Sequence, residues 1–460
     1  MRVARTRGVL VSLMGAVAAL AALVLLGVLV PGHGLYAVTG AVAILMIGAT
    51  IFQPAAIPVL AMPALVVVQR IGGESTNLSF SDFALFAAFW PAVLLGPRPY
   101  SKPMRSLLWL SAIYQLTTLF TVVANPYKAN TIEWFHAWLS VAGAIIVGWV
   151  IGRSGQARVA LTLFLVCCAA IAVLTVIQWV GQLAQGDTGP VYLHVPYEMN
   201  KNFVGNLLAF AAVAAYARPP WLRWSPWLTR AAFWLCTAAV VGSQARQALI
   251  GLGVALVFLC LRRSSGVKHS RWILLGLVPA AYYVGTLLAE QITSGNQFNS
   301  TYQRLTWYQE ALSVWTSHQW FGVGLRWWTA GRTQYGFQPP NAELEVLTSA
   351  GTVGLVGFLI LMVGAVVILW RVNPVYGSLG VAVVGMRLVE GQFDLFWVSV
   401  QVSVPFAIAG ICLGALVHDD PARGGGGGLG EITTDGGPRT RASASASRQT
   451  CTDIEDAVTP

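Results

Sequence analysis

The chain has 460 residues, of which 56% are hydrophobic and only 10% are charged. Soluble domains carry roughly a quarter charged residues, so this composition excludes an ordinary soluble globular protein. The net charge of +10 does not indicate nucleic-acid binding, because most Lys and Arg residues fall in short loops between apolar runs. Basic residues in such loops set the orientation of a membrane protein. We therefore expect membrane lipids, and no nucleic acid, as partners.

Repeated apolar runs are the main structural signal. A helix of about 20 residues crosses the roughly 30 Å of hydrocarbon in a bilayer, and helices satisfy their own backbone there. The sequence therefore predicts an all-α, polytopic membrane protein with about 12–14 transmembrane helices, the range arising from short runs and from runs broken by proline. The expected runs are 9–30, 35–52, 55–70, 80–96, 106–124, 133–152, 159–181, 201–217, 229–243, 247–261, 272–290, 343–370, 375–390 and 396–416.

The first run follows a basic N-terminus that contains Arg2, Arg5 and Arg7. Its length favours a permanent helix over a cleaved signal peptide. Alternating the later runs across the bilayer leaves most basic residues on the side of the N-terminus. This pattern predicts a multi-pass protein of the bacterial cytoplasmic membrane with both termini in the cytoplasm.

Two short segments on the predicted outer side carry candidate functional residues. The first precedes Phe203 and contains Asn200 and Asn202, which are typical helix N-caps or, alternatively, acceptor-binding residues. The second is Gly-Ser-Gln-Ala-Arg-Gln, residues 242–247. Arg246 in this segment is costly near the membrane unless it is paired or solvated, so it is a functional candidate.

Possible partners of Arg246 are Glu390, Asp394 or a bound phosphate. Arg387 is spaced to pair with Glu390 at i,i+3.

The long polar segment 290–342 is the most informative part of the chain. Apolar residues at helical spacing predict an amphipathic helix over 301–317. Arg304 lies in its first turn, where a cation opposes the helix dipole. An anion bound there would satisfy the arginine and the free backbone amides. The alternative is a surface arginine that extends into solvent.

The rest of this segment predicts a tight turn at Phe321–Gly324 and a helix start at Asn341. Trp327 and Trp328 favour anchoring at the membrane interface, with stacking on a sugar ring as the alternative. Asn341 is a typical N-cap, and Glu343 in the first helical turn complements the dipole.

The remaining features are simpler. Residues 418–460 are rich in Gly, Ser and Ala and predict a disordered cytoplasmic tail, which leaves 1–417 as the transmembrane domain. Five of the six cysteines lie in apolar runs, and we expect no disulfides. The histidines lack metal-ligand spacing, so we expect neither a metal nor another cofactor.

Three pieces of sequence together resemble the O-antigen ligase/polymerase superfamily. They are the stretch Gly-Ser-Gln-Ala-Arg-Gln-Ala-Leu-Ile-Gly around Arg246, the stretch Arg-Leu-Thr-Trp-Tyr-Gln-Glu-Ala-Leu from Arg304 followed by Phe-Gly-Val-Gly, and Pro-Asn-Ala-Glu-Leu-Glu-Val-Leu from Pro340. The resemblance covers 190–370, and elsewhere it rests on topology.

The resemblance implies a GT-C-like membrane glycosyltransferase. Its donor would be a glycan on polyprenyl diphosphate, such as undecaprenyl diphosphate, and its acceptor a hydroxyl of a glycan, lipid or protein. Arg246 and Arg304 match the two family arginines that hold the diphosphate. Pro340 stands where family ligases carry histidine, so the general base is open between Glu343, Glu345 and His318, with Glu343 preferred. The residues expected to bind substrate are Asn341, Arg326, Asn202 and Trp307.

Two other functions remain open at this point. A lipid-linked glycan flippase or transporter would move its substrate without breaking a bond. This chain shows no duplicated halves and few polar residues at mid-membrane, which counts against that alternative. A polysaccharide-binding membrane protein without catalytic activity would bind glycan but not turn it over.

Overall fold

The computed structural model describes residues 48, 50, 52–71, 78–262, 271–276, 282, 285–286, 300–335, 337–397 and 399–420. The predicted first helix over 9–30 and the predicted tail from 421 onward lie outside these residues. Most of runs 35–52 and 272–290 also lies outside them. The described residues are overwhelmingly helical, which confirms the expected all-α class.

Helices occur at nearly all of the predicted apolar runs that the structure describes. The run 55–70 is an exception in length, since its helix ends at Ala64, after Pro63 has removed a backbone donor in its last turn. The α-helices are α3 (Ala56–Ala64), α4 (Phe80–Leu95), α5 (Lys102–Ala124), α6 (Lys128–Trp138), α7 (Ala144–Arg153), α8 (Ala157–Ala184), α9 (Lys201–Ala217), α10 (Pro226–Ser243), α11 (Arg246–Leu261), α13 (Ser300–Ser317), α14 (Ala342–Arg371), α15 (Pro374–Glu390) and α16 (Ser399–Asp419).

Short elements complete the described fold. A π-helical turn, η1 (Leu139–Gly143), joins α6 to α7, and 3-10 turns form η2 (Pro220–Leu222) and η3 (Arg271–Gly276). Between α3 and α4, the antiparallel strands β1 (Arg70–Ile71) and β2 (Leu78–Ser79) form a small hairpin.

Five described helical segments are long and apolar enough to cross a membrane: 102–124, 128–153, 157–184, 342–371 and 400–419. Several of these helices expose apolar side chains at helical spacing. On α14 the exposed residues include Val356, Ile360, Val363 and Val367. A large apolar surface of this kind is unfavourable in water and suits contact with lipid. The composition and the helices together show a polytopic membrane protein.

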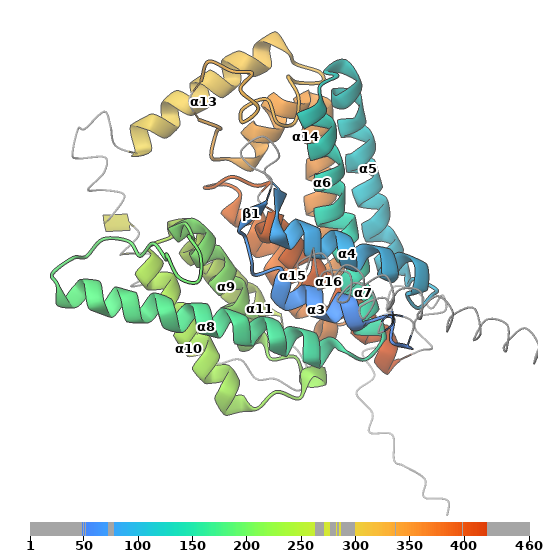
Figure 1. Ribbon diagram of the computed structural model, residues 1–460, viewed down its shortest axis with the longest axis vertical. Coiled ribbons are helices and arrows are strands. Elements are labelled where there is room, and N and C mark those ends of the chain that lie inside the picture. Colours follow the sequence, from blue (N-terminus) through green and yellow to red (C-terminus); the bar gives the residue numbers. More distant parts are fainter. Residues whose placement is uncertain are drawn as a thin grey trace, which may run out of the picture.

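The centre of the molecule is the pair α7 and α16, which lie side by side (Figure 1). Their backbones approach closely because each carries a Gly-x-x-x-Gly pair. An added Cβ at Gly148 would lie 2.0 Å from the Ala407 oxygen, and one at Gly410 would lie 2.3 Å from the Ile145 oxygen. Small residues allow such close contact between membrane helices.

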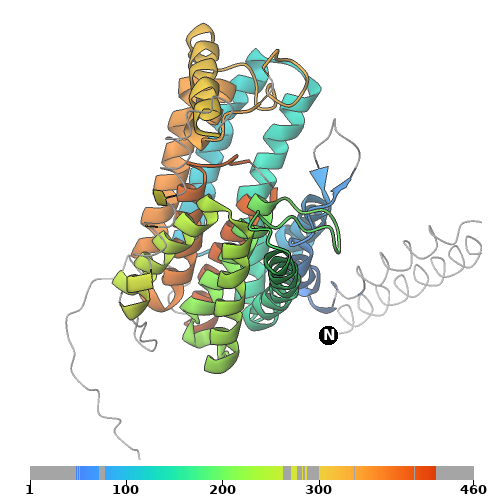
Figure 2. The same cartoon turned by 90° about the vertical axis from the view of Figure 1, so that its left-hand side faces the viewer.

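One end of the molecule is covered by α13 and the loop that follows it (Figures 1 and 2). We call α13 and residues 318–341 the cap. The cap docks onto a break in α14 at Gly351, whose φ of 69° and ψ of −172° are not helical. The amide of Thr352 donates to the Gln319 oxygen at 2.8 Å, and that of Gly324 donates to the Ser349 oxygen at 2.9 Å. The loop therefore satisfies backbone groups that the broken helix leaves open.

Helices α9, α10 and α11 form a second group beside the centre, crossed by α8 (Figure 1). Helix α11 packs on α15 through Gly251, where an added Cβ would lie 2.8 Å from Cγ of Glu390. This packing brings the N-termini of α9 and α11 close to the end of α15.

Candidate functional site

The first residues of α9 and α11 meet at Asp394, in the connection between α15 and α16. Nδ2 of Asn202 donates to Oδ1 of Asp394 at 3.4 Å. Nε2 of Gln247 donates to Oδ2 of the same carboxylate at 3.3 Å. Asn202 was expected to bind substrate, and Gln247 directly follows Arg246. The carboxylate thus joins two predicted site segments that are far apart in the sequence.

Cationic side chains surround this junction. Arg246 at the start of α11 interacts electrostatically with Lys201 at the start of α9. Arg304, in the first turns of α13, acts electrostatically on Asp394. Burial raises the pKa of Asp394 above the usual aspartate value, while Arg387 and then Arg304 oppose the rise. The cations Lys201, Arg246, Arg304 and Arg387 thus reach the junction from four separate helices, which gives an anionic ligand several possible partners.

Arg387 fixes the connection that carries Asp394. Its Nη2 donates to the Leu395 oxygen at 2.7 Å and also to the Phe396 oxygen. Its Nη1 lies 3.5 Å from Oε2 of Glu390, which confirms the predicted i,i+3 pair. Because Arg387 is buried and held by these groups, we interpret it as a structural residue.

The start of α14 lies on the same connection. Asn341 accepts from the Leu344 amide at 3.0 Å, which confirms the predicted N-cap, and its Nδ2 donates to the Gln392 oxygen at 3.3 Å. Oε1 of Glu343 accepts from Nε2 of Gln392 at 2.7 Å. Oε2 of Glu343 is buried and has no hydrogen-bond partner among the described residues. A carboxylate oxygen left in this way can accept a proton or a hydrogen bond from a ligand.

The connection of residues 391–397 therefore forms hydrogen bonds with Asn202, Asn341 and Glu343. Arg304 acts on this connection through its charge. Arg246 adjoins it through the neighbouring residue Gln247. The sequence pattern identified the helix starts, because caps and first-turn charges are local. It considered Asp394 only as a possible partner of Arg246 and missed Gln247 and Gln392. Asp394, Gln247 and Gln392 each lie in a short polar stretch between two apolar runs, and this pattern could have identified them as site candidates.

Arg326 and Trp307 lie elsewhere in the cap. Arg326 is buried, its Nε lies 3.8 Å from Oε2 of Glu133, and it donates to Thr329 at 3.2 Å. Glu133 and Asp82 both bond His136, at 3.1 and 2.9 Å. This chain of charged groups attaches the cap to α6 and α4.

Trp307 packs against Phe337, with 5.1 Å between ring centroids. This contact joins α13 to the loop that leads to Asn341.

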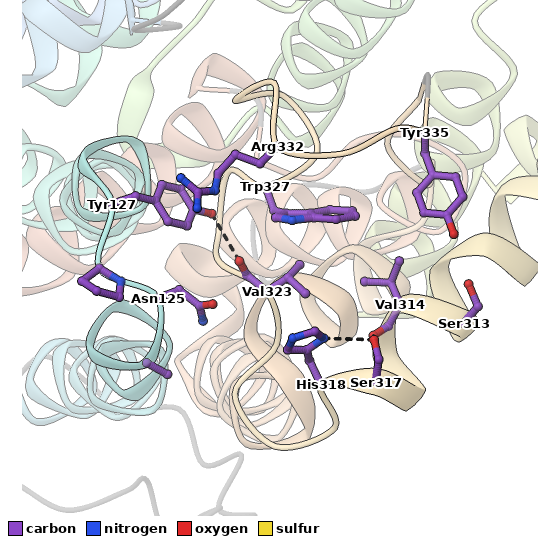
Figure 3. Close-up of a pocket in the computed structure, with 12 residues that line it drawn as sticks. Asn125, Tyr127, Ser313, Val314, Ser317, His318, Val323, Trp327, Arg332 and Tyr335 are labelled. Carbon is purple, nitrogen blue, oxygen red and sulfur yellow. Dashed lines mark hydrogen bonds between the residues drawn. The ribbon is translucent and has the colours of Figure 1, made fainter.

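A cavity of about 580 Å³ opens between the cap and the connection of α5 to α6 (Figure 3). His318, one of the alternative bases, lines it and is bonded to Ser317 at 3.0 Å. A second, small cavity lies beside Tyr114 and Glu345. Among the residues that the structure describes, neither Arg246 nor Arg304 lines either of these two cavities. The junction at Asp394 and this cavity are therefore separate features.

Other expectations concern metal and cysteine. In the ranges that the structure describes, no three His, Cys, Asp or Glu side chains are grouped to hold a metal ion. The five cysteines in those ranges are free thiols, as expected, and four of them are buried. Cys451 lies outside the described residues.

Residues 231–359 match the family model described as O-antigen ligase. The matched stretch runs from α10 into α14 and contains Arg246, Arg304 and Glu343, whereas Asn202 and Asp394 lie outside it. The comparison with curated proteins returned no match. A domain match that covers these arginines, on a polytopic helical fold, confirms the resemblance seen in the sequence. Residues 231–359, a little over a quarter of the chain, are thus similar to the O-antigen ligase family.

Proposed function

We propose that this protein transfers a glycan from a polyprenyl-diphosphate carrier, such as undecaprenyl diphosphate, to an acceptor hydroxyl. The transfer takes place at the outer face of the bacterial cytoplasmic membrane and without a metal ion. The acceptor hydroxyl belongs to a glycan, a lipid or a protein, so that the enzyme is a surface-polysaccharide polymerase or ligase. In this proposal the cap faces the outside, and the diphosphate binds at the junction around Asp394.

The convergence of three distant helix starts on one connection supports this proposal most directly. The start of α9 contributes Asn202, the start of α11 contributes Arg246 and Gln247, and the start of α13 contributes Arg304. Helix N-termini and arginine side chains both favour phosphate groups. Asp394 balances these cations in the protein without ligand, and an incoming diphosphate takes over that role.

The reaction breaks the bond between the anomeric carbon and the diphosphate oxygen. The acceptor oxygen forms a new bond to that carbon, and the electron pair of the broken bond remains on the diphosphate. Arg246 and Arg304 stabilise the negative charge that develops there. Their guanidinium groups stay charged and bind two phosphate oxygens at once, so they suit a leaving group that gains charge.

The acceptor hydroxyl loses its proton as the new bond forms. We assign its removal to Glu343, because this carboxylate adjoins the junction and its buried Oε2 has no partner among the described residues. Asn341 positions Glu343 by capping α14, and Asn202 orients Asp394. Arg326 and Trp307 act as positioning residues, since their contacts hold the cap in place.

The test is a transfer assay on the full-length protein in lipid nanodiscs, with a labelled polyprenyl-diphosphate glycan from the native host as donor. We expect Arg246→Ala and Arg304→Ala each to lower the rate of transfer about 100-fold or more, because each removes a cation from the leaving group. Arg371→Ala is the control, since Arg371 is an exposed arginine in the last turn of α14, away from the junction.

Transfer at the wild-type rate in both junction variants would contradict the proposal. Movement of the intact donor across the bilayer, without cleavage, would instead identify a flippase. Glycan binding without turnover in the wild-type protein would identify a binding protein.

A further inference from the structure

The cavity beside the cap is built from three separated parts of the chain. The connection of α5 to α6 provides Asn125 and Tyr127, the last turns of α13 provide Ser313 and Ser317, and the following loop provides Trp327. Figure 3 shows these side chains around one open space. Its volume of about 580 Å³ lies within the range of about 300–1,000 Å³ that is usual for small-molecule sites.

Aromatic rings form much of the wall and are held in fixed positions. Trp327 packs edge-on against Trp328, with 5.1 Å between ring centroids, and lies 6.4 Å from the ring of Tyr335. Trp328 is buried and donates from Nε1 to Oγ1 of Thr348 at 3.1 Å. Trp327 is therefore supported from behind by a ring that is itself bonded to α14, while it lines the cavity.

Tyr127 is equally fixed. Its hydroxyl donates to the Val323 oxygen at 3.4 Å, and Gly324 packs so closely on it that an added Cβ would lie 2.0 Å from the phenol oxygen. Burial raises the pKa of Tyr127 to about 12, so the phenol remains protonated and keeps this hydrogen bond at neutral pH.

Arg332 supplies polar groups to the cavity. Its guanidinium lies over the Tyr127 ring, 4.3 Å from the centroid, and the side chain is exposed. No carboxylate lies within ion-pair distance of Arg332 among the residues that the structure describes. A guanidinium that is stacked on a ring and not ion-paired presents several N–H donors toward the cavity.

We propose that this cavity binds a sugar unit of a glycan, with the sugar ring packed on Trp327 and its oxygens bonded by Arg332. The apolar C–H face of a sugar ring suits an aromatic surface, and its hydroxyl or carboxylate oxygens suit a fork of N–H donors. The class of ligand rests on the proposed glycan transfer, whereas the location rests on the cavity itself.

The bound sugar is remote from the reacting bond. Arg304 and Ser313 are separated by nine residues of α13, which corresponds to roughly 14 Å at 1.5 Å per residue. The cavity therefore contacts a unit farther along the glycan chain. Such a contact changes how strongly the glycan binds and leaves the chemical step unchanged.

The experiment measures binding to the full-length protein in nanodiscs by calorimetry. The probe is the oligosaccharide released by mild acid from the lipid-linked glycan of the native host, so it carries no diphosphate. We expect Trp327→Ala and Arg332→Ala to weaken binding about tenfold or more, as loss of an anchoring contact does. Trp327→Phe keeps an aromatic ring and should retain most of the affinity, which separates the loss of stacking from a folding defect.

Trp320→Ala is the matched control, because Trp320 is a 66% exposed tryptophan of the same loop and is not part of the cavity wall. In transfer assays, Trp327→Ala should raise KM with kcat unchanged. A second assay varies the donor and the acceptor separately, and the partner whose KM rises is the one that places its sugar here.

The proposal is overturned if the released glycan does not bind the wild-type protein, or if both cavity variants bind it as tightly as the wild type. These outcomes are independent of catalysis, because Arg246→Ala should bind the released glycan normally. Transfer at the wild-type rate in Arg246→Ala, with glycan binding to the cavity intact, would count against the diphosphate site alone.

Discussion

Asp394 has an unusual environment for a carboxylate in a membrane protein. It accepts hydrogen bonds from Asn202 and Gln247, and it faces the charges of Arg387, Arg304, Glu345 and Glu390. Its negative charge thus orients the starts of α9 and α11 and neutralises part of the cationic cluster. Loss of that charge should affect the site even if Asp394 never touches the substrate.

This reasoning gives a prediction for pH. Burial raises the pKa of Asp394, so the side chain takes up its proton at a higher pH than an ordinary aspartate does. The protonated form no longer balances Arg304, and transfer should therefore fall as pH decreases through this raised pKa. Asp394→Asn should lower the rate roughly 100-fold, the scale expected when catalytic groups are misplaced. It should also abolish this acidic limb of the pH–rate profile.

The control for this experiment is Asn202→Ala, which removes one hydrogen bond to Asp394 but keeps its charge. That variant should keep the acidic limb at a reduced rate. A variant Asp394→Asn with the wild-type profile would show that another group produces the limb.

At the scale of elements, the molecule depends on close contact between α7 and α16. The two Gly-x-x-x-Gly pairs are Gly148 with Gly152 and Gly410 with Gly414. An added Cβ at any of these four positions would lie within 2.4 Å of a backbone oxygen of the facing helix. A larger residue must therefore separate the two central helices.

We predict that Gly148→Leu destabilises the protein strongly. Overpacking of a core costs about 1–3 kcal/mol or more, and here the contact is with rigid backbone. The temperature of unfolding in detergent should fall by about 1–3 °C or more, measured by tryptophan fluorescence. Gly181→Leu on α8 is the matched control, because an added Cβ there meets no atom within 4 Å. Equal unfolding temperatures for the two variants would refute the role of this contact.

The elements also show what could be predicted from the sequence. Apolar run lengths predicted nearly every described helix, and local spacing predicted the Asn341 cap and the pair of Arg387 with Glu390. The approach of Asn202 to Asp394 could not be predicted, since 192 residues separate them. The docking of the cap onto Gly351 was also missed, because the glycines involved have no periodic pattern that indicates their partners.

At the scale of the whole molecule, the cap and the η2 turn lie at opposite ends (Figure 1). Helix α9 begins at the Asp394 junction and ends before η2 after 17 residues, which is roughly 25 Å, close to the thickness of the hydrocarbon core. The arginines of the two ends differ in their surroundings. In the cap, Arg326 approaches Glu133 and the exposed Arg332 stacks on Tyr127, whereas the segment around η2 carries Arg218, Arg223 and Arg230 within thirteen residues.

This cluster supports an orientation with η2 in the cytoplasm, because an excess of basic residues in a short loop favours that side of the membrane. Substituted cysteines test it. Gln334→Cys places a thiol on an exposed position of the cap, and Arg223→Cys places one beside η2. A membrane-impermeant maleimide should label Gln334→Cys in intact spheroplasts and label Arg223→Cys only after permeabilisation. The parent chain carries Cys451→Ser, because Cys451 lies in the predicted cytoplasmic tail, and its background should then be low, since four of the five described cysteines are buried. The reverse labelling pattern would place the cap and its arginines in the cytoplasm, where an outer-face transfer reaction is impossible.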